Sequence, residues 1–531
     1  MLGFHRRTRS LIPVKDLGKY DQVAANEEEE DVELDMDDSD TLVDEVSAAT
    51  DKARQRQLIL IYVVFLAEAI MASSLQPQLQ MLISDSEFCA NLSTSYLRSI
   101  LDCAYAFGGT TGLFWGYLAD RMGRRQVTLM GLWTMFVCCM SMGFATDLAS
   151  CTLFRYFAGF ASSTVVVTSL TMIGDVSRDF EERAQNVAFL PLIASFGSIG
   201  PLIQGMVSES LHSSGAVWEK FPILGSQLAC GSLVLSIAVT ATIMLQETLP
   251  MDTSSSMNRM DQDCEKAAFL SENDSDAPRI AVIDFVRPEP ITINQFMQVP
   301  SFLVLLASFS LLALHAATFD VVLPHLGHQS SQEGGMGLPC QWLGLTVLVV
   351  KGVAGITIKH VIPTAIEKFG LLKLYRSTSL LFPTIYIITP LLALAAASAC
   401  TNGFVALTSA IGLLAKHVLT GGATVLVALL VLNTTPDAYS AGTVVGIMQI
   451  ANLFEALAVA VSGVSFYLSD GLSVSTANLA LWTCLALFGS CGAALAYFVR
   501  ERPSVERDFP SEVLCWETCF DADAEKSDFD T

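Results

Sequence analysis

The sequence predicts an all-α membrane protein with twelve transmembrane helices, arranged as two six-helix halves. Of its 531 residues, 52% are hydrophobic and only 16% are charged, and the apolar residues recur in runs of about 20 or more. The acidic residues are concentrated in the two tails and in one central segment. A soluble helical bundle would need a polar stripe on each surface helix, but the stretch 380–397 contains no charged residue. We therefore expect the apolar excess to face lipid.

Apolar windows long enough to cross a bilayer locate the individual helices. We expect transmembrane helices over residues 58–82, 96–119, 126–146, 148–173, 185–209, 223–245, 301–324, 341–365, 374–398, 403–431, 440–468 and 474–499.

Charged segments define the domain organisation and the orientation. The short loops that carry most of the Lys and Arg, such as residues 121–125, are expected on the cytoplasmic side, and both tails lie on the same side as these loops. A run of Asp and Glu between residues 27 and 45 lacks Lys and Arg, which predicts disorder. The predicted divisions are a disordered acidic cytoplasmic tail at 1–56, an N-terminal six-helix half at 57–250, a cytoplasmic linker at 251–298, a C-terminal six-helix half at 299–500 and a cytoplasmic tail at 501–531.

Charge and residue types exclude several classes of function. A net charge of −23 repels phosphate backbones, so we expect no nucleic-acid partner. No enzyme signature such as HExxH or GxSxG occurs, so we expect no enzyme and no cofactor. Cys515 and Cys519 are spaced as CxxxC without a nearby histidine, so we assign no metal site. Asn91 begins an Asn-Leu-Ser sequon in a loop on the outer side, which makes it a candidate glycosylation site in a eukaryote.

The segment GYLADRMGRR, at residues 116–125, has the composition of a gate at the end of the second helix. Gly116 lets two helices approach closely, and Gly123 permits a tight turn. Asp120 can pair with an arginine or a helix N-terminus in one conformation only. At every defined position the segment resembles the GxLaDRxGRR signature of the major facilitator superfamily. We assign to this gating motif Gly116, Asp120, Arg121, Gly123, Arg124 and Arg125.

An internal repeat and two further motifs support this resemblance. Residues 367–373 repeat the order acid, base, glycine after the eighth helix, which indicates two related halves with a substrate site between them. Arg155 and Gly159 resemble the RxxxG signature of the drug–proton antiporters in this superfamily. An arginine inside an apolar span indicates a proton-relay or substrate role, unless its side chain snorkels to a helix end.

The fifth helix contains GSIGPLIQG at residues 197–205, which resembles the GxxxGPxxGG signature of antiporters. Phe196 and Gln204 stand where that signature has glycine. The resemblance favours export, and the alternative is a kink that serves packing alone. The residues that we assign to this kink are Gly197, Gly200, Pro201 and Gly205.

Short motifs elsewhere refine the family. The segments LAEAI (66–70), IGD (173–175), QETLP (246–250), HAATFD (315–320), GGMG (334–337) and LNTTP (432–436) resemble the fungal and plant zinc-induced facilitator-like group of twelve-spanner antiporters, distantly similar to tetracycline-efflux proteins. This resemblance implies proton-driven export of small molecules. The eleventh helix departs from the group, because Glu455 lies where a glycine–proline pair is expected.

Buried ionisable residues are the candidates for proton coupling and transport. Glu68 is the first, because a carboxyl among apolar helices can exchange protons between conformations, although it can also be a purely structural hydrogen-bond acceptor. His315 and Asp320 form either a second titrating pair or an outer salt bridge. Glu455 is a substrate contact, a further proton site, or a structural partner of Lys416 or Lys351. The candidate set is Glu68, Arg155, Asp175, His315, Asp320, Lys416 and Glu455.

The expected function is efflux of a drug, secondary metabolite or organic acid, driven by the proton gradient. The alternatives are a proton-coupled importer of a nutrient and a transporter-derived sensor that binds without transport. We expect a monomer in a lipid bilayer whose partners are a small-molecule substrate and protons. The plasma membrane is the expected location, with the vacuolar membrane as the alternative. The residues do not identify the substrate.

Overall fold

The computed structural model describes three stretches of the chain. They are residues 36–73, residues 94–249 except 146, 198–217, 219–220 and 222, and residues 293–499 except 334, 339, 400–401, 436–437 and 469–473. Four predicted functional residues, most of the predicted linker and the C-terminal tail lie outside these stretches; the four residues are Asn91, Gly200, Pro201 and Gly205.

The described chain is helical, and ten of its spans are long and apolar enough to cross a membrane. These spans coincide to within a few residues with ten of the predicted spans. The first span is the exception: its helix begins before the predicted residue 58, and the described stretch ends at residue 73, before the predicted end at residue 82. The helices that form the ten spans are α1 (Met36–Ser73), α5 (Arg124–Gly143), α6 (Leu148–Val176), α11 (Leu224–Met244), α14 (Pro300–His328), α15 (Cys340–Phe369), α16 (Leu371–Ala399), α17 (Asn402–Thr434), α18 with α19 (Ala441–Met448 and Ala451–Leu468) and α20 (Val474–Phe498).

Two broken helices lie where the second and fifth spans are expected. The second consists of α3 (Thr94–Gly109) and α4 (Gly112–Met122), and the fifth begins with α7 (Phe180–Ala188) and α8 (Leu190–Gly197). Between α3 and α4, the Thr110 hydroxyl donates to the Phe107 carbonyl and the Thr111 hydroxyl donates to the Gly108 carbonyl. Such local hydrogen bonds compete with the helical ones, which explains the break.

Helix α1 begins earlier than expected, at Met36. Residues 36–56 are therefore helical, whereas the sequence analysis assigned them to a disordered tail. Arg54 attaches this helix to the bundle, because its guanidinium donates to the Glu182 carboxylate at 2.9 Å.

Asp147 is the N-cap residue of helix α6. The Asp147 carboxylate accepts hydrogen bonds from the hydroxyl and the backbone N–H of Ser150. Both hydrogen bonds stabilise the ionised carboxyl and therefore lower the pKa of Asp147 from its ordinary value, and the bond from the Ser150 hydroxyl has the larger effect. The cap fixes where this long buried helix starts.

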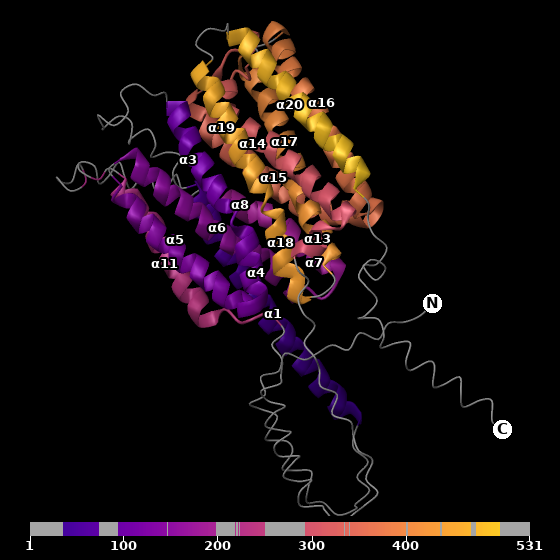
Figure 1. Ribbon diagram of the computed structural model, residues 1–531. Coiled ribbons are helices and arrows are strands. Elements are labelled where there is room, and N and C mark those ends of the chain that lie inside the picture. The colour runs from indigo at the N-terminus through magenta and orange to yellow at the C-terminus, as the bar shows by residue number, and fades with distance from the viewer. Residues whose placement is uncertain are drawn as a thin grey trace, which may run out of the picture.

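The helices form two halves that lie side by side (Figure 1). The N-terminal half contains α1 to α11, and the C-terminal half contains α14 to α20. The short helix α13 (Ile293–Met297) precedes α14 in the chain. Across the boundary α4 packs against α18, α3 against α19, and α8 against α15. The N-terminal part of α1 projects from the end of the bundle at which α4 and α18 meet (Figure 1). We call this end the motif end, because it carries residues 116–125.

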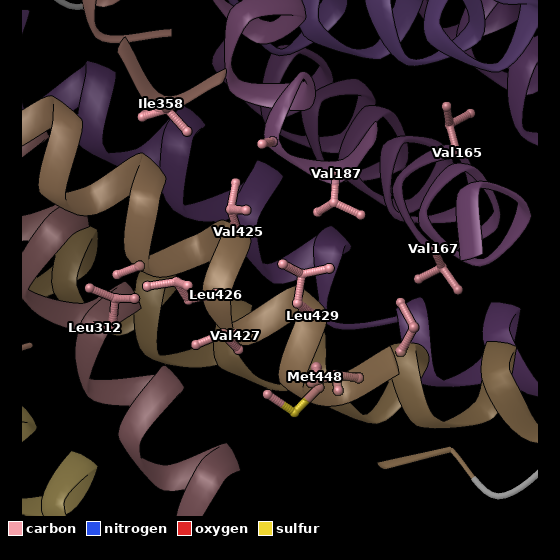
Figure 2. Close-up of a cluster of buried hydrophobic side chains, with 14 of the residues drawn as sticks. Val165, Val167, Val187, Leu312, Ile358, Val425, Leu426, Val427, Leu429 and Met448 are labelled. Carbon is pink, nitrogen blue, oxygen red and sulfur yellow. The ribbon is translucent and has the colours of Figure 1, made fainter. Parts of the chain in front are cut away.

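One apolar core extends across both halves. Figure 2 shows Val187 of α7 facing Val425 and Leu429 of α17, and Val167 of α6 opposite Met448 of α18. The outer faces are apolar as well, and Leu380, Ile243 and Tyr497 are each more than two-thirds exposed, at 68%, 76% and 70%. An apolar surface of this kind suits a lipid environment.

Helices α3 and α6 approach each other closely at a glycine of the RxxxG motif. A Cβ atom added at Gly159 would lie 2.0 Å from the carbonyl oxygen of Tyr105. Only a residue without a side chain fits there, which gives the second glycine of the motif a packing function.

We predict that Gly159→Ala destabilises the protein by about 1–3 kcal/mol, because the added methyl overpacks the contact between α3 and α6. The matched control is Gly352→Ala in α15, where an added Cβ meets nothing within 4 Å. Thermal unfolding of both variants in lipid nanodiscs measures the difference. Equal unfolding temperatures would show that the contact is not tight.

Candidate functional site

The turn between α4 and α5 is fixed by a residue to which the sequence analysis assigned no role. Gly123 adopts a φ of +102°, which favours glycine. The Glu247 carboxylate accepts hydrogen bonds from the backbone N–H groups of Arg124 at 2.8 Å and Arg125 at 3.0 Å, and so caps the N-terminus of α5. Glu247 lies in the QETLP motif, so only its resemblance to a family motif marked it as important.

The Arg124 guanidinium connects two acidic groups close to this turn. This guanidinium is fully buried, forms an ion pair with Asp175, and lies 3.8 Å from the Asp120 carboxylate. Asp175 also accepts a hydrogen bond from the Thr248 hydroxyl at 2.9 Å. The gating motif and the IGD motif, which the sequence analysis treated separately, therefore form one network.

Asp120 joins the two halves of the protein. Its carboxylate accepts hydrogen bonds from the backbone N–H groups of Gly442 at 2.9 Å and Thr443 at 2.6 Å, and from the Thr443 hydroxyl at 2.8 Å. These groups form the N-terminus of α18, where the helix dipole attracts a negative charge. A Cβ added at Gly116 would lie 2.0 Å from the Gly442 carbonyl oxygen, so Gly116 permits the approach that makes the cap possible.

A second contact between the halves involves α8 and α15. A Cβ added at Gly355 would lie 2.7 Å from the Cα atom of Leu192, and the Ser195 hydroxyl donates to the Lys351 carbonyl at 2.9 Å. Lys359 also places its ammonium group 4.5 Å from the centre of the Phe189 ring. The halves are thus held together by close backbone contacts at two separate pairs of helices.

Glu68 lies in a buried polar network of the N-terminal half. Its side chain is 9% exposed, and its Oε1 accepts hydrogen bonds from the Ser162 hydroxyl at 2.7 Å and the Tyr105 hydroxyl at 3.3 Å. The three residues come from α1, α6 and α3. The sequence analysis identified Glu68 but neither of these partners, because hydroxyl side chains are common in apolar helices.

Arg155 lies beside this network and does not snorkel to a helix end. Its guanidinium is 5% exposed and donates to the Ala72 carbonyl at 2.9 Å, and it lies 3.8 Å from the Asp102 carboxylate. The guanidinium carbon lies 4.2 Å from the centre of the Tyr105 ring, whose hydroxyl binds Glu68. Tyr105 therefore links the buried arginine to the buried carboxyl.

Asp320 pairs with Lys416 and not with His315. The Lys416 ammonium group donates to the Asp320 carboxylate at 2.6 Å, and the side chains are 1% and 49% exposed, respectively. Of the alternatives for Glu455, a structural pairing with Lys416 is not the arrangement found, because Lys416 has Asp320 as its partner. The ammonium group also lies 4.7 Å from the centre of the Phe319 ring. Helices α14 and α17 bring these residues together, which sequence spacing could not reveal.

His315 has a structural environment instead. Its Nδ1 lies 2.9 Å from the Tyr386 hydroxyl, and its ring lies 4.7 Å from that of Phe382. The imidazole is 2% exposed. His315 is therefore part of an aromatic cluster between α14 and α16, and the predicted titrating pair with Asp320 does not form.

Glu455 faces the interior of the bundle and is nevertheless accessible to water. Ala451, Ala458 and Val459 share its face of α19 by helical spacing, and all three are less than 5% exposed, whereas Glu455 is exposed. Asp320 is likewise 49% exposed, beside the buried Phe319. We interpret these two exposed carboxylates as facing water-accessible space inside the protein, because an ionisable side chain that faces lipid is costly.

The remaining described motif residues lie at the surface or in helix contacts. Arg121 is exposed and stacks at 4.4 Å on the ring of Tyr117. The Arg125 guanidinium donates to the Thr242 carbonyl at 2.9 Å. A Cβ added at Gly197 would lie 2.4 Å from the Cβ atom of Ala69, so this glycine allows α8 to pack against α1.

Comparison with known proteins identifies the family. The model of the Major Facilitator Superfamily matches residues 58–460. The chain belongs to the Major Facilitator Superfamily. It is therefore a multi-pass membrane transporter and not an enzyme. The superfamily is the one that the gating motif resembles.

Individual relatives of this superfamily are distant. The chain is 24% identical over 452 residues to the major facilitator superfamily multidrug transporter mfsB of Aspergillus fumigatus, covering 71% of each protein. It is 24% identical over 205 residues to ZINC INDUCED FACILITATOR-LIKE 1 of Arabidopsis thaliana, covering 36% of this chain and 42% of the relative. The solved proton:xylose symporter XylE aligns with a TM-score of 0.58 and 14% identity, over 85% of this chain and 97% of XylE. The structural likeness establishes the superfamily fold alone.

We predict that Asp120→Asn weakens the cap on α18, because hydrogen bonds to a charged acceptor contribute about 1.5–3 kcal/mol and those to a neutral one about 0.5–1.5 kcal/mol. Hydrogen–deuterium exchange at the amides of residues 442–446 should become faster by roughly an order of magnitude, as a change of about 1.4 kcal/mol in an opening equilibrium requires. Asp179→Asn, at an exposed position just beyond α6, is the matched control. Unchanged exchange in Asp120→Asn would contradict the cap.

We predict that removing Asp320 is more damaging than removing Lys416. Asp320→Ala leaves a buried ammonium group without its carboxylate, which costs about 3–5 kcal/mol, whereas Lys416→Met leaves a carboxylate that water still reaches. Unfolding temperatures in nanodiscs should therefore fall further for Asp320→Ala, and the double variant should recover part of the loss. An equal fall in unfolding temperature in the two single variants would contradict the prediction that water reaches Asp320 but not Lys416.

Proposed function

We propose that this transporter exports a small organic molecule in exchange for protons, by alternating access. The observation that carries the proposal is the position of Glu68, a buried carboxyl in α1 whose hydrogen-bond donors are the hydroxyls of Ser162 and Tyr105. An ionised carboxyl inside an apolar bundle costs about 2.5–3.5 kcal/mol, so a conformation that isolates Glu68 from water favours its protonation. Proton binding can thereby be coupled to a change of conformation.

The conformation of the protein supports one state of such a cycle. The motif end is closed, because Asp120 caps α18 and α8 packs against α15. Asp320 and Glu455 face water-accessible space within the bundle. With the motif end on the cytoplasmic side, this is a state open to the outside, in which protons reach the site and the exported molecule leaves.

The cycle then follows from the charges. Protonation removes the charge of Glu68 and allows the halves to rock, which breaks the cap formed by Asp120. Release of the proton on the cytoplasmic side restores the carboxylate before a new substrate binds. Arg155 holds the Tyr105 ring and the end of α1 in both steps, because its guanidinium contacts Tyr105 and the Ala72 carbonyl.

Export is supported by similarity and is tested against the alternatives. The relative mfsB is named a multidrug transporter, and residues 197–205 resemble an antiporter signature. The chain then handles a small molecule and protons at the plasma or the vacuolar membrane, as a monomer. An importer would use the same Glu68 in the opposite direction, and a sensor would bind without transport.

We predict that Glu68→Gln abolishes proton-driven export, because glutamine cannot exchange a proton. Untargeted mass spectrometry of cells and medium should show a compound retained by a deletion strain and by the Glu68→Gln strain. Its release by the wild type should increase when the outside is acidified. The amount of the compound retained in the Glu68→Gln strain should approach that in the deletion strain, because export stops when an essential proton carrier is lost.

The matched control is Glu181→Gln, an exposed residue in the first turn of α7. This variant should export as the wild type does at equal expression. If a compound instead fails to enter cells without the protein, the importer replaces the exporter. If no compound is redistributed between the wild type and the deletion strain, the sensor replaces both.

A further inference from the structure

Three sulfur atoms meet in the core of the N-terminal half, apart from the residues assigned to transport. Cys139 of α5 lies with its Sγ 3.8 Å from the Sγ of Cys230 in α11 and 3.8 Å from the Sδ of Met71 in α1. All three residues are at most 3% exposed, and both cysteines are free thiols. Cys139 thus has one sulfur neighbour from each of two other helices.

The distances between these atoms suit ligands of one ion. Two sulfurs bound at about 2.3 Å to a tetrahedral metal stand about 3.8 Å apart, which is the separation found for Cys139 with each of its two neighbours. A disulfide would require about 2.05 Å, so the cysteines are not covalently linked. Cys139 and either neighbour therefore need little movement to share a metal.

A small enclosed cavity adjoins this cluster. It has a volume of about 10 Å³, enough for a single small guest, and Met71, Cys138, Cys139, Met142 and Arg155 are among the residues that line it. Arg155 is 5% exposed, and its Nε has no hydrogen-bond partner among the described residues. The cavity therefore combines soft sulfur ligands with an uncompensated guanidinium N–H.

The residue types and the charge select the ion. Thiolate and thioether ligands favour Cu(I), whereas zinc sites use thiolate, imidazole and carboxylate. Within the described residues no group of three or more His, Cys, Asp or Glu is arranged to hold a metal, so the thioether of Met71 is decisive. Two thiolates with Cu(I) carry one negative charge, which the guanidinium of Arg155, in the lining of the adjoining cavity, attracts.

We propose that Cys139, Cys230 and Met71 form a Cu(I) site in the core of the N-terminal half. On binding, the two thiols lose their protons to solvent and the copper remains Cu(I), so no oxidant or reductant is consumed. The site ties α1, α5 and α11 together next to Arg155. The site adjoins the transport network, because the Met71 carbonyl accepts a hydrogen bond from Arg155 at 3.5 Å, but its three ligands are residues to which the proposed transport function assigns no role.

The full-length protein, reduced and under argon, is titrated with Cu(I) in competition with bicinchoninate. All variants carry Cys515→Ser and Cys519→Ser, which removes the CxxxC pair as a competing ligand. The protein should bind one Cu(I) per chain more than Cys139→Ala does, with sulfur ligands at about 2.3 Å in the X-ray absorption spectrum. Cys230→Ala and Met71→Leu should weaken binding by about tenfold to a hundredfold.

Cys484→Ala is the control, since Cys484 is an exposed thiol of α20 and its loss should leave binding unchanged. Gel filtration and circular dichroism establish that each variant is folded, and Met71→Leu provides a conservative variant if a cysteine substitution disturbs the core. Equal copper content in the parent, Cys139→Ala and Met71→Leu would overturn the proposal. So would a bound copper without sulfur ligands.

Discussion

The cost of placing a charge inside an apolar helical bundle governs the arrangement of this transporter. Each buried charge must have a partner of opposite sign or a set of hydrogen bonds. Arg124 is paired with Asp175, Lys416 with Asp320, and the Arg155 guanidinium with the Ala72 carbonyl. Because these partners come from different helices, the pairings fix how the helices pack within each half. The apolar residues fill the space between them but do not select one arrangement.

The boundary between the halves follows a different rule. Within each half, charges are paired by side chains, but across the boundary the principal polar contact is between one carboxylate and a helix N-terminus. Asp120 can leave this cap without stranding an arginine, because Arg124 keeps its ion pair with Asp175. Glycines at positions 116, 355 and 442 provide close backbone contact in place of interlocking side chains. A boundary built in this way can open and close again, as alternating access requires.

Several pairings could not be predicted from the sequence for a physical reason. The five-residue spacing of His315 and Asp320 already places them on different faces of one helix. Their actual partners, Tyr386 and Lys416, lie on other helices, and the sequence does not show which helices touch. The interior exposure of Glu455 was also not predictable, because exposure depends on the shape of the neighbouring helices. Glu247 had only its motif to mark it, since a capping carboxylate is recognised by the helix that it caps.

The sequence by itself determined the membrane class, ten of the predicted spans and the superfamily. Ten described spans follow the apolar windows, because the bilayer thickness sets helix length and the hydrophobic effect sets composition. The gating motif identified the superfamily because its glycines and charges meet local requirements of one turn. Only the tertiary structure decided which charges pair, which carboxylates meet water and which helices touch. These properties depend on residues that lie far apart in the chain, and local spacing carries no information about such contacts.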